Sequence, residues 1–183
     1  MSRVVIETGR MSNWLHGALE SRGLSVACID ARQAHAVLSQ MHNKTDSNDA
    51  AMLAELARTG FYRKVMVKSR AAQERRALLG AREAALNARR NAENTIRGLL
   101  ASFGLRLPPQ PRTYEGRVRA VLEGHDAVAR IVMPLLAIRT VALRQAATLT
   151  KELVAMARGC DATTRLMTIP GVGCVTAATF VAT

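Results

Sequence analysis

Residues 44–50 read Lys44-Thr45-Asp46-Ser47-Asn48-Asp49-Ala50 and place two carboxylates three residues apart at the start of an expected helix. Residues at i and i+3 lie on one face of a helix, so Asp46 and Asp49 can point at one ion. A hard cation such as Mg²⁺ takes oxygen ligands and offsets the repulsion between two such carboxylates. The simpler alternative is that Asp46 caps the helix and that Asp49 suits the positive end of its dipole. The stretch indicates half of an acidic metal site, and other residues have to decide between the two interpretations.

Short β-like segments alternate with helical segments around this stretch. The expected strands are residues 4–6, 24–29 and 64–67, and the expected helices are residues 12–22, 31–40 and 46–58. This alternation predicts an α/β sheet with helical crossovers. Glu7 follows the first strand at its carboxyl end, the edge where open α/β sheets usually bind ligands. Glu7 is therefore a candidate third carboxylate, and a surface Glu in a turn is the alternative.

Two long helices are expected after the α/β part. The first covers residues 69–103, and its apolar residues recur at the steps of three and four that are typical of a coiled coil. The Pro-rich residues 107–111 break it, and a second long helix is expected over residues 126–157 with Pro134 inside it. Arg139 interrupts the second apolar row of that helix. Such helices can fold back on each other or pair with another copy of the chain, and the sequence does not choose between the two.

The charge of the chain is uneven. The whole chain has 26 Lys and Arg against 14 Asp and Glu, a net charge of +12. Residues 1–60 carry 6 basic and 6 acidic side chains, whereas residues 61–140 carry 16 and 6. The excess indicates a polyanionic partner, with nucleic acid as the first candidate. The arginines of the first long helix are candidate phosphate contacts, although a solvated charged face is the alternative: Arg75, Arg76, Arg82, Arg89, Arg90 and Arg97.

Three features of the sequence bear on the cellular location of the protein: its apolar runs, its first residues and its cysteines. No apolar run approaches the length of a membrane-spanning helix, and the first residues lack the order of a signal peptide. The three cysteines stand far apart, which favours reduced thiols in a cytoplasmic protein. We expect no membrane partner and a cytoplasmic, nucleoid-associated location.

The last motif is Ile169-Pro170-Gly171-Val172-Gly173, which opens an apolar helix. Its form resembles the turn of a helix-hairpin-helix element, whose exposed N–H groups bind DNA phosphate. Gly171 and Gly173 are therefore candidate nucleic-acid contacts, and an ordinary tight turn is the alternative.

Taken in order, these features resemble the DEDD-type insertion-sequence transposases, recombinases with a RuvC-like N-terminal domain that a bridge RNA directs. The resemblance rests on the Glu7-Thr8-Gly9 turn, the K-T-D-x-x-D-A stretch, the Arg-rich helices and the I-P-G-V-G motif, and it covers essentially the whole chain. It implies an α/β fold: a partial RuvC-like, RNase H-like sheet domain over residues 1–67, followed by helical regions. The second region is a long antiparallel basic coiled coil over residues 68–160, with a linker near 105–113. The third, residues 161–183, is the start of a helical C-terminal transposase domain.

The resemblance also implies roles for single residues. Glu7, Asp46 and Asp49 are expected to be catalytic and to bind Mg²⁺, and Lys44, the six arginines and the two glycines to contact nucleic acid. DNA, a guide RNA and further copies of the chain are the implied partners.

Two parts of the family pattern are absent from this sequence: a first Asp on an upstream strand and a serine nucleophile in the C-terminal domain. We therefore expect a fragment that does not recombine DNA alone, and whether it is an enzyme stays open. The alternative is a noncatalytic nucleic-acid-binding or assembly module whose acids are helix caps. Both interpretations predict binding that weakens with salt, so salt dependence does not separate them.

Overall fold

The structure is a computed structural model that describes residues 3–39, 45–109 and 113–182. The chain divides into two compact units, Met1–Ser69 and Arg70–Thr183, called unit 1 and unit 2 below. A small parallel sheet in a mainly helical chain confirms the predicted combination of helix and strand. The RuvC-like and coiled-coil assignments stay predictions.

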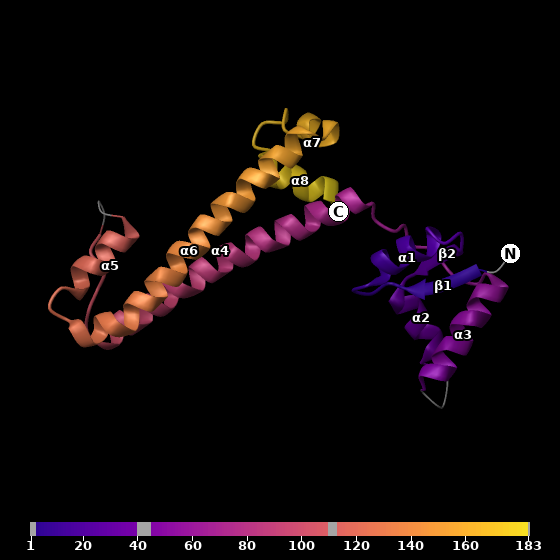
Figure 1. Cartoon of the computed structure of the whole chain (residues 1–183), viewed down its shortest axis with the longest axis horizontal. Coiled ribbons are helices and arrows are strands. Elements are labelled where there is room, and N and C mark those ends of the chain that lie inside the picture. The colour runs from indigo at the N-terminus through magenta and orange to yellow at the C-terminus, as the bar shows by residue number, and fades with distance from the viewer. Residues whose placement is uncertain (1–2, 40–44, 110–112, 183) are drawn as a thin grey trace. The chain divides into compact units, whose positions relative to one another are not determined.

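Unit 1 is a small α/β unit. Its elements are β1 (Arg3–Glu7), α1 (Ser12–Glu20), β2 (Ser25–Ile29), α2 (Ala31–Leu38) and α3 (Asp46–Thr59). The two strands pair in parallel, with Glu7 opposite Ile29. Parallel neighbours need a crossover, which α1 supplies. In Figure 1, α1 lies on one side of β1, and α2 and α3 lie on the other.

The core of unit 1 is compact. Ile29, Ala34 and Leu56 are buried together, and Val5, Leu53 and Tyr62 pack around them. Leu56 fastens α3 to this core, and α3 ends at Gly60, whose φ of 72° is left-handed. The position of α3, and of the acidic residues at its start, thus depends on a few apolar contacts.

The prediction of a third strand over residues 64–67 is wrong. Lys64 forms one isolated antiparallel bridge with Ile29, and the N–H of Val65 donates to the carbonyl oxygen of Cys28 at 2.8 Å. Met66 is 91% exposed. The run has β-branched residues, but it lacks a surface that would bury both its faces, so the pairing stops after one bridge.

Unit 2 is built on a helical hairpin. Its elements are α4 (Arg70–Ser102), α5 (Tyr114–Leu122), α6 (Asp126–Arg158), α7 (Asp161–Leu166) and α8 (Cys174–Ala182). Figure 1 shows α4 and α6 side by side and antiparallel. Each has 33 residues, which corresponds to a length of about 50 Å. Of the two arrangements left open by the sequence, the structure shows the helices folded back on each other.

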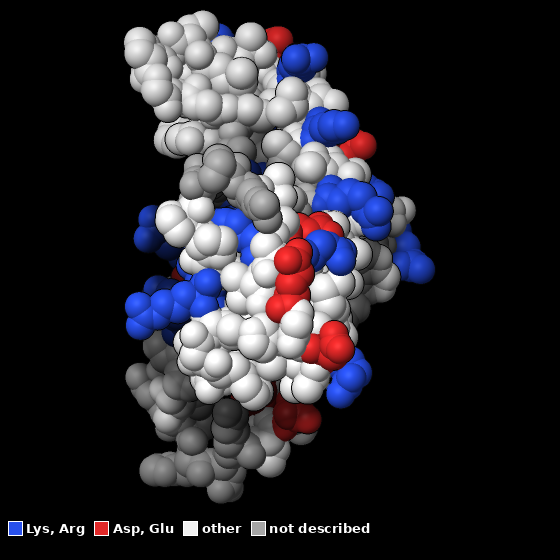
Figure 2. All heavy atoms as spheres, turned by 90° about the vertical axis from the view of Figure 1, so that its left-hand side faces the viewer, with Lys and Arg blue, Asp and Glu red and all other residues white. Residues whose placement is uncertain are grey.

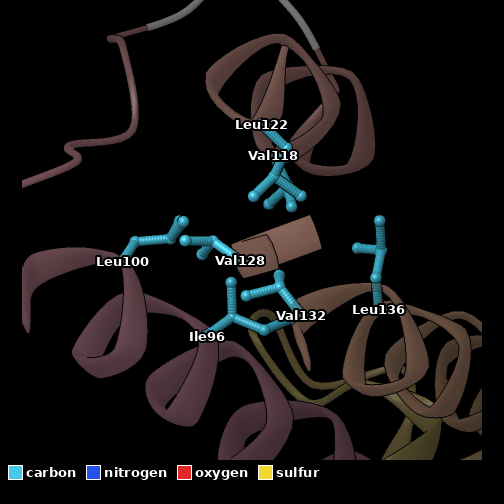
Figure 3. Close-up of a cluster of buried hydrophobic side chains, with 7 residues drawn as sticks. All are labelled: Ile96, Leu100, Val118, Leu122, Val128, Val132 and Leu136. Atoms are coloured by element: carbon cyan, nitrogen blue, oxygen red, sulfur yellow. The ribbon is translucent and has the colours of Figure 1, made fainter. Parts of the chain in front are cut away.

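The loop end of the hairpin holds a cluster of seven buried apolar residues (Figure 3). It joins α4, α5 and α6 through Ile96, Leu100, Val118, Leu122, Val128, Val132 and Leu136. Leu105 and Leu107 from the predicted linker pack against this cluster. Gln110 and Pro111 of that linker lie outside the described residues. These two leucines therefore attach the start of the linker to the core.

At the other end of the hairpin, α7 and α8 pack on the long helices. These residues belong to unit 2, and their assignment to the start of a further domain stays a prediction. Ala177, Ala178 and Ala182 of α8 are buried, as are Leu153 and Ala157 of α6. Small side chains allow helices to approach closely, so this end is held by Ala-rich packing. Over the described residues, the helices are too short or too polar to cross a bilayer.

Candidate functional site

The two aspartates of residues 44–50 occupy the first turn of α3. The helix is capped by Thr45, whose hydroxyl oxygen accepts a hydrogen bond from the N–H of Asn48 at 3.2 Å. The alternative in which Asp46 is the cap is therefore wrong, because Thr45 fills that role. Within the described part of the chain, neither Asp46 nor Asp49 has a hydrogen bond or an ion pair from its side chain. Both carboxylates are free for another partner. Lys44 lies outside the described residues.

Glu7 is the last residue of β1 and is half-buried. The next residue ties this strand end to α2, because the Thr8 hydroxyl oxygen accepts from the N–H of Ala31 at 2.9 Å. The N–H of Thr8 donates to the carbonyl oxygen of Ile29 at 2.9 Å. The backbone that carries Glu7 is thereby held at the carboxyl edge of the sheet, as predicted from the sequence.

A metal site requires that the side chains of Glu7, Asp46 and Asp49 lie close enough together to bind one ion. Nowhere in residues 3–39, 45–109 or 113–182 do three His, Cys, Asp or Glu side chains gather closely enough to hold an ion. Asp46 and Asp49 share a helix face, but Glu7 does not complete a three-ligand set with them. The described residues alone therefore do not fit a Mg²⁺ site.

Most of the candidate arginines on α4 are engaged within the hairpin. Arg82 donates from Nε to the hydroxyl oxygen of Thr150 on α6 at 2.9 Å. The other contacts join Arg89 to Glu93 at 3.8 Å, Arg90 to Glu83 at 2.9 Å, and Arg97 to Asn94 at 2.7 Å. Cations that already have such partners offer less to an incoming phosphate.

Arg75 and Arg76 differ from those four. Arg75 is half-buried, and its Nε has no hydrogen-bond partner in the described part of the chain. Arg76 is exposed and lines an open pocket of about 240 Å³ with Leu79, Thr179 and Ala182, between α4 and α8.

A polar cluster around Tyr114 was not predicted. Arg139 of α6 forms an ion pair with Glu93 of α4, with 3.0 Å between Nε and Oε1, and the two side chains are 13% and 14% exposed. The Tyr114 hydroxyl donates to the carbonyl oxygen of Glu93 at 3.1 Å, and the Arg139 guanidinium lies over its ring, 4.8 Å from the centroid. Burial, and then the charge of Glu93, raise the pKa of Tyr114. The cluster fastens α5 to both long helices, and the interruption of an apolar row by Arg139 was its only signal in the sequence.

The glycine motif forms a turn between α7 and α8. The N–H of Val172 donates to the carbonyl oxygen of Ile169 at 3.0 Å, and Gly171 has a φ of 83°. Only Gly171 therefore needs glycine for its backbone, since Gly173 has no positive φ. The order helix, turn, helix agrees with the predicted element, while phosphate contact by Gly171 and Gly173 stays a prediction.

Comparison with known proteins gives the class of the chain. A family model described as a transposase matches residues 2–104, which include all of unit 1 that the structure describes and all of α4. The chain belongs to this family, the DEDD-type transposases of the IS110 group.

A curated relative supports the same assignment. The transposase for insertion sequence element IS1111A of Coxiella burnetii (strain RSA 493 / Nine Mile phase I) is 31% identical over 140 residues. The aligned part covers 74% of this chain and 38% of that protein. The chain therefore spans well under half of the length of this relative.

Proposed function

We propose that this chain is a nucleic-acid-binding part of an insertion-sequence transposase, with DNA as its main partner. The observation that carries the proposal is the excess of cations in a member of a transposase family: 16 basic against 6 acidic side chains in residues 61–140. Lysines and arginines that meet phosphates release counterions, and this release drives binding to nucleic acid. Lys and Arg side chains also outnumber Asp and Glu on the face of the molecule seen in Figure 2.

For the longer protein we propose metal-dependent cleavage and recombination of DNA, with Glu7, Asp46 and Asp49 among the ligands of Mg²⁺. When bound, such an ion positions phosphate and stabilises charge at the scissile bond. Two observations support the assignment: Asp46 is not used as a cap, and the side chains of Asp46 and Asp49 are unpaired in the described residues. Because no three-ligand set forms among those residues, we assign no catalytic step to this chain.

A second candidate is a noncatalytic nucleic-acid-binding or assembly module. The lack of a three-ligand set in the described residues favours it. It accounts equally well for the basic hairpin, but it gives the free carboxylates of α3 no role.

The partners proposed beyond DNA are a guide RNA and further copies of the chain. A basic surface attracts the backbone of RNA as it does that of DNA. Self-association is supported by Ile131, Ile138 and Val141 of α6, which are 50%, 54% and 47% exposed. These residues recur at steps of seven and three, the spacing of a helix-pairing seam. A cytoplasmic location near the nucleoid is part of this proposal.

The experiment is a calorimetric titration of the full chain with Mg²⁺, together with a duplex-DNA binding assay. If the metal proposal holds, Asp49→Ala and Asp46→Asn weaken Mg²⁺ binding and leave duplex binding in place. Asp161→Asn is the matched control, because Asp161 is also the exposed first residue of a helix. Unchanged Mg²⁺ binding with duplex binding intact would leave the noncatalytic module, and a wild-type chain without affinity for duplex DNA would refute both candidates.

A further inference from the structure

A row of three cations runs along the outer side of α6. Arg144, Lys151 and Arg158 follow one another at steps of seven residues, and all three are exposed. Seven residues make nearly two helical turns, so the row stays on one side of the helix with about 10.5 Å between successive positions. The buried residues of the same stretch, such as Ala146 and Leu153, lie on the side that packs against α4. The row, called the outer row below, therefore points away from the hairpin seam.

No acid lies three or four residues from the outer row on α6 itself. Glu152 follows Lys151 directly and is therefore about 100° away around the helix, and Asp161, three residues after Arg158, lies beyond the end of α6. The positions three and four residues from Arg144 and Lys151 hold only Thr, Val and Ala, and those before Arg158 hold Val154 and Ala155. Among the described residues, none of the three cations forms an ion pair or a side-chain hydrogen bond. The arginines of α4 differ, since Arg82, Arg89, Arg90 and Arg97 all have partners within the hairpin. In the described part of the chain, exposed cations without an acidic partner thus lie in a row on α6, in addition to Arg76 on α4.

The row begins at Arg144 for a simple reason. Seven residues before Arg144 the helix has Ala137, which carries no charge. Seven residues before Ala137 it has Arg130, but Asp126 lies four residues from Arg130 on the same helix face. A carboxylate at that spacing partly offsets the charge of the arginine. The three residues from Arg144 to Arg158 are therefore the uncompensated part.

We propose that the outer row binds the phosphate backbone of duplex DNA. This inference rests on the proposed function and assigns the contact to named residues. Charge complementarity argues for a polyanion, because three unpaired cations about 10.5 Å apart meet phosphates without first breaking internal ion pairs.

The surroundings of the row favour a duplex over a single strand. Proteins that hold single strands stack the bases on aromatic side chains. The sequence of α6 contains no aromatic residue, so this face of the helix offers no ring for stacking. The exposed residues three or four positions from Arg144 and Lys151 include Val141, Ala147, Thr148 and Ala155. Their small size also lets a rigid backbone approach the helix closely, with the longer Arg and Lys side chains reaching the phosphates.

The test uses the full chain with a fluorescently labelled 20-base-pair duplex, and it measures binding as a function of KCl concentration. The row variant is Arg144→Gln, Lys151→Gln and Arg158→Gln, which replaces exposed helix residues with a good helix former. The matched control is Arg58→Gln, Arg70→Gln and Arg119→Gln. These three are exposed cations, each with a carboxylate partner at 2.5–3.0 Å. Both variants lose three positive charges, so the long-range field falls equally.

The row variant is expected to reduce the slope of log binding constant against log salt by about 2 to 3, because each phosphate contact contributes about 0.9. Lys151→Gln alone is expected to reduce it by about 1. The control should change the slope by less than about 0.9, the contribution of one phosphate contact. Equal slopes for the row variant and the control would overturn the proposal while leaving DNA binding established.

Two further outcomes have defined meanings. A wild-type chain that does not bind the duplex would overturn the proposed function, and the outer row with it. A row variant that loses affinity for duplex RNA but not for duplex DNA would overturn the choice of DNA as the partner. Circular dichroism at 222 nm checks that each variant keeps its helices.

Discussion

Units 1 and 2 bury their cores in different ways. In unit 1 the buried cluster joins three residues of β2, α2 and α3. In unit 2 seven residues of α4, α5 and α6 form one cluster, and an ion pair between Glu93 and Arg139 is almost buried beside it. The candidate carboxylates thus stand on the unit with the smaller core, and the cations stand on the larger one. Since small units bury less of their surface, we expect unit 1 to be the less stable.

The stability of each unit can be measured separately. The chain has one tryptophan, Trp14, which lies on α1 of unit 1, so its fluorescence reports on that unit. Circular dichroism at 222 nm is dominated by unit 2, because α4 and α6 have 33 residues each.

The largest effect is expected from Ile96→Ala. Ile96 is fully buried in the cluster of unit 2, and such a truncation costs about 2–5 kcal/mol in lost transfer energy and cavity formation. In urea, the midpoint of the dichroism curve should fall, and that of Trp14 fluorescence should stay in place. Leu143→Ala is the control, because Leu143 is 40% exposed. An equal fall of both midpoints would show that the two units unfold together.

Glu93→Gln is expected to have the next largest effect. The change leaves the guanidinium of Arg139 without its charged partner in a site where both are nearly buried, at a cost of about 1–3 kcal/mol. The dichroism midpoint is again the measurement. Glu115→Gln, which removes an exposed partner of Arg119, should cost about 0–1 kcal/mol.

The double variant Glu93→Leu with Arg139→Leu sharpens this result. Replacing both charges by apolar groups is often neutral, so we expect most of the loss to be recovered. A double variant less stable than Glu93→Gln would mean that the pair itself, rather than an unpaired charge, determines the stability of the cluster.

A smaller loss of stability, of similar size in the two units, is expected when one helix cap of each unit is removed. Thr45 caps α3 in unit 1 through the N–H of Asn48, and Thr113 caps α5 in unit 2 through the N–H of Gly116 at 3.1 Å. Each Thr→Ala change should cost about 1 kcal/mol. Thr45→Ala should move only the Trp14 curve, and Thr113→Ala only the dichroism curve. Serine at either position should restore the cap.

The last prediction compares the reactivity of one cysteine thiol in each unit, and it involves no change in stability. Burial raises the pKa of the Cys28 thiol in unit 1, whereas the neighbouring side chain and backbone of Thr163, aided by the charge of Arg75, lower the pKa of Cys160 in unit 2. The thiolate is the reactive form, so Cys160 should react with iodoacetamide at a lower pH than Cys28. Mass spectrometry across a pH series measures this order. Thr163→Val should shift Cys160 to higher pH, and unfolding in urea should abolish the difference.

Local features were predicted well from the sequence. The periodic apolar residues and the breakers Gly23 and Gly60 gave the helices and the first two strands to within about two residues at most ends. A helix start and a breaker depend on neighbouring residues, so a single sequence contains the information.

Features that depend on distant residues were not predicted. The pairing of Glu93 with Arg139 spans 46 residues, and that of Arg82 with Thr150 spans 68. Which arginines are free depends on these pairings. The sequence favoured all six arginines of α4, whereas among the described residues the structure leaves only Arg75 and Arg76 of those six, together with a row on α6, without a side-chain hydrogen bond or an ion pair. Whether residues 64–67 form a strand likewise depends on the surfaces that distant parts of the chain offer them for packing. The roles of Glu7, Asp46 and Asp49 stay predictions.

The antiparallel register of α4 and α6 has a consequence for how the hairpin folds. Contacts near the α5 end, such as those between Ile96 and Val132, close a short stretch of chain, whereas Arg82 and Thr150 are 68 residues apart. Each doubling of the closed length costs about 0.6 kcal/mol in chain entropy. The helices should therefore zip together from the α5 end, and the docking of α7 and α8 should come last. Pulsed hydrogen exchange during refolding would then protect the amides of Ile96 and Val132 before those of Ala177 and Ala178.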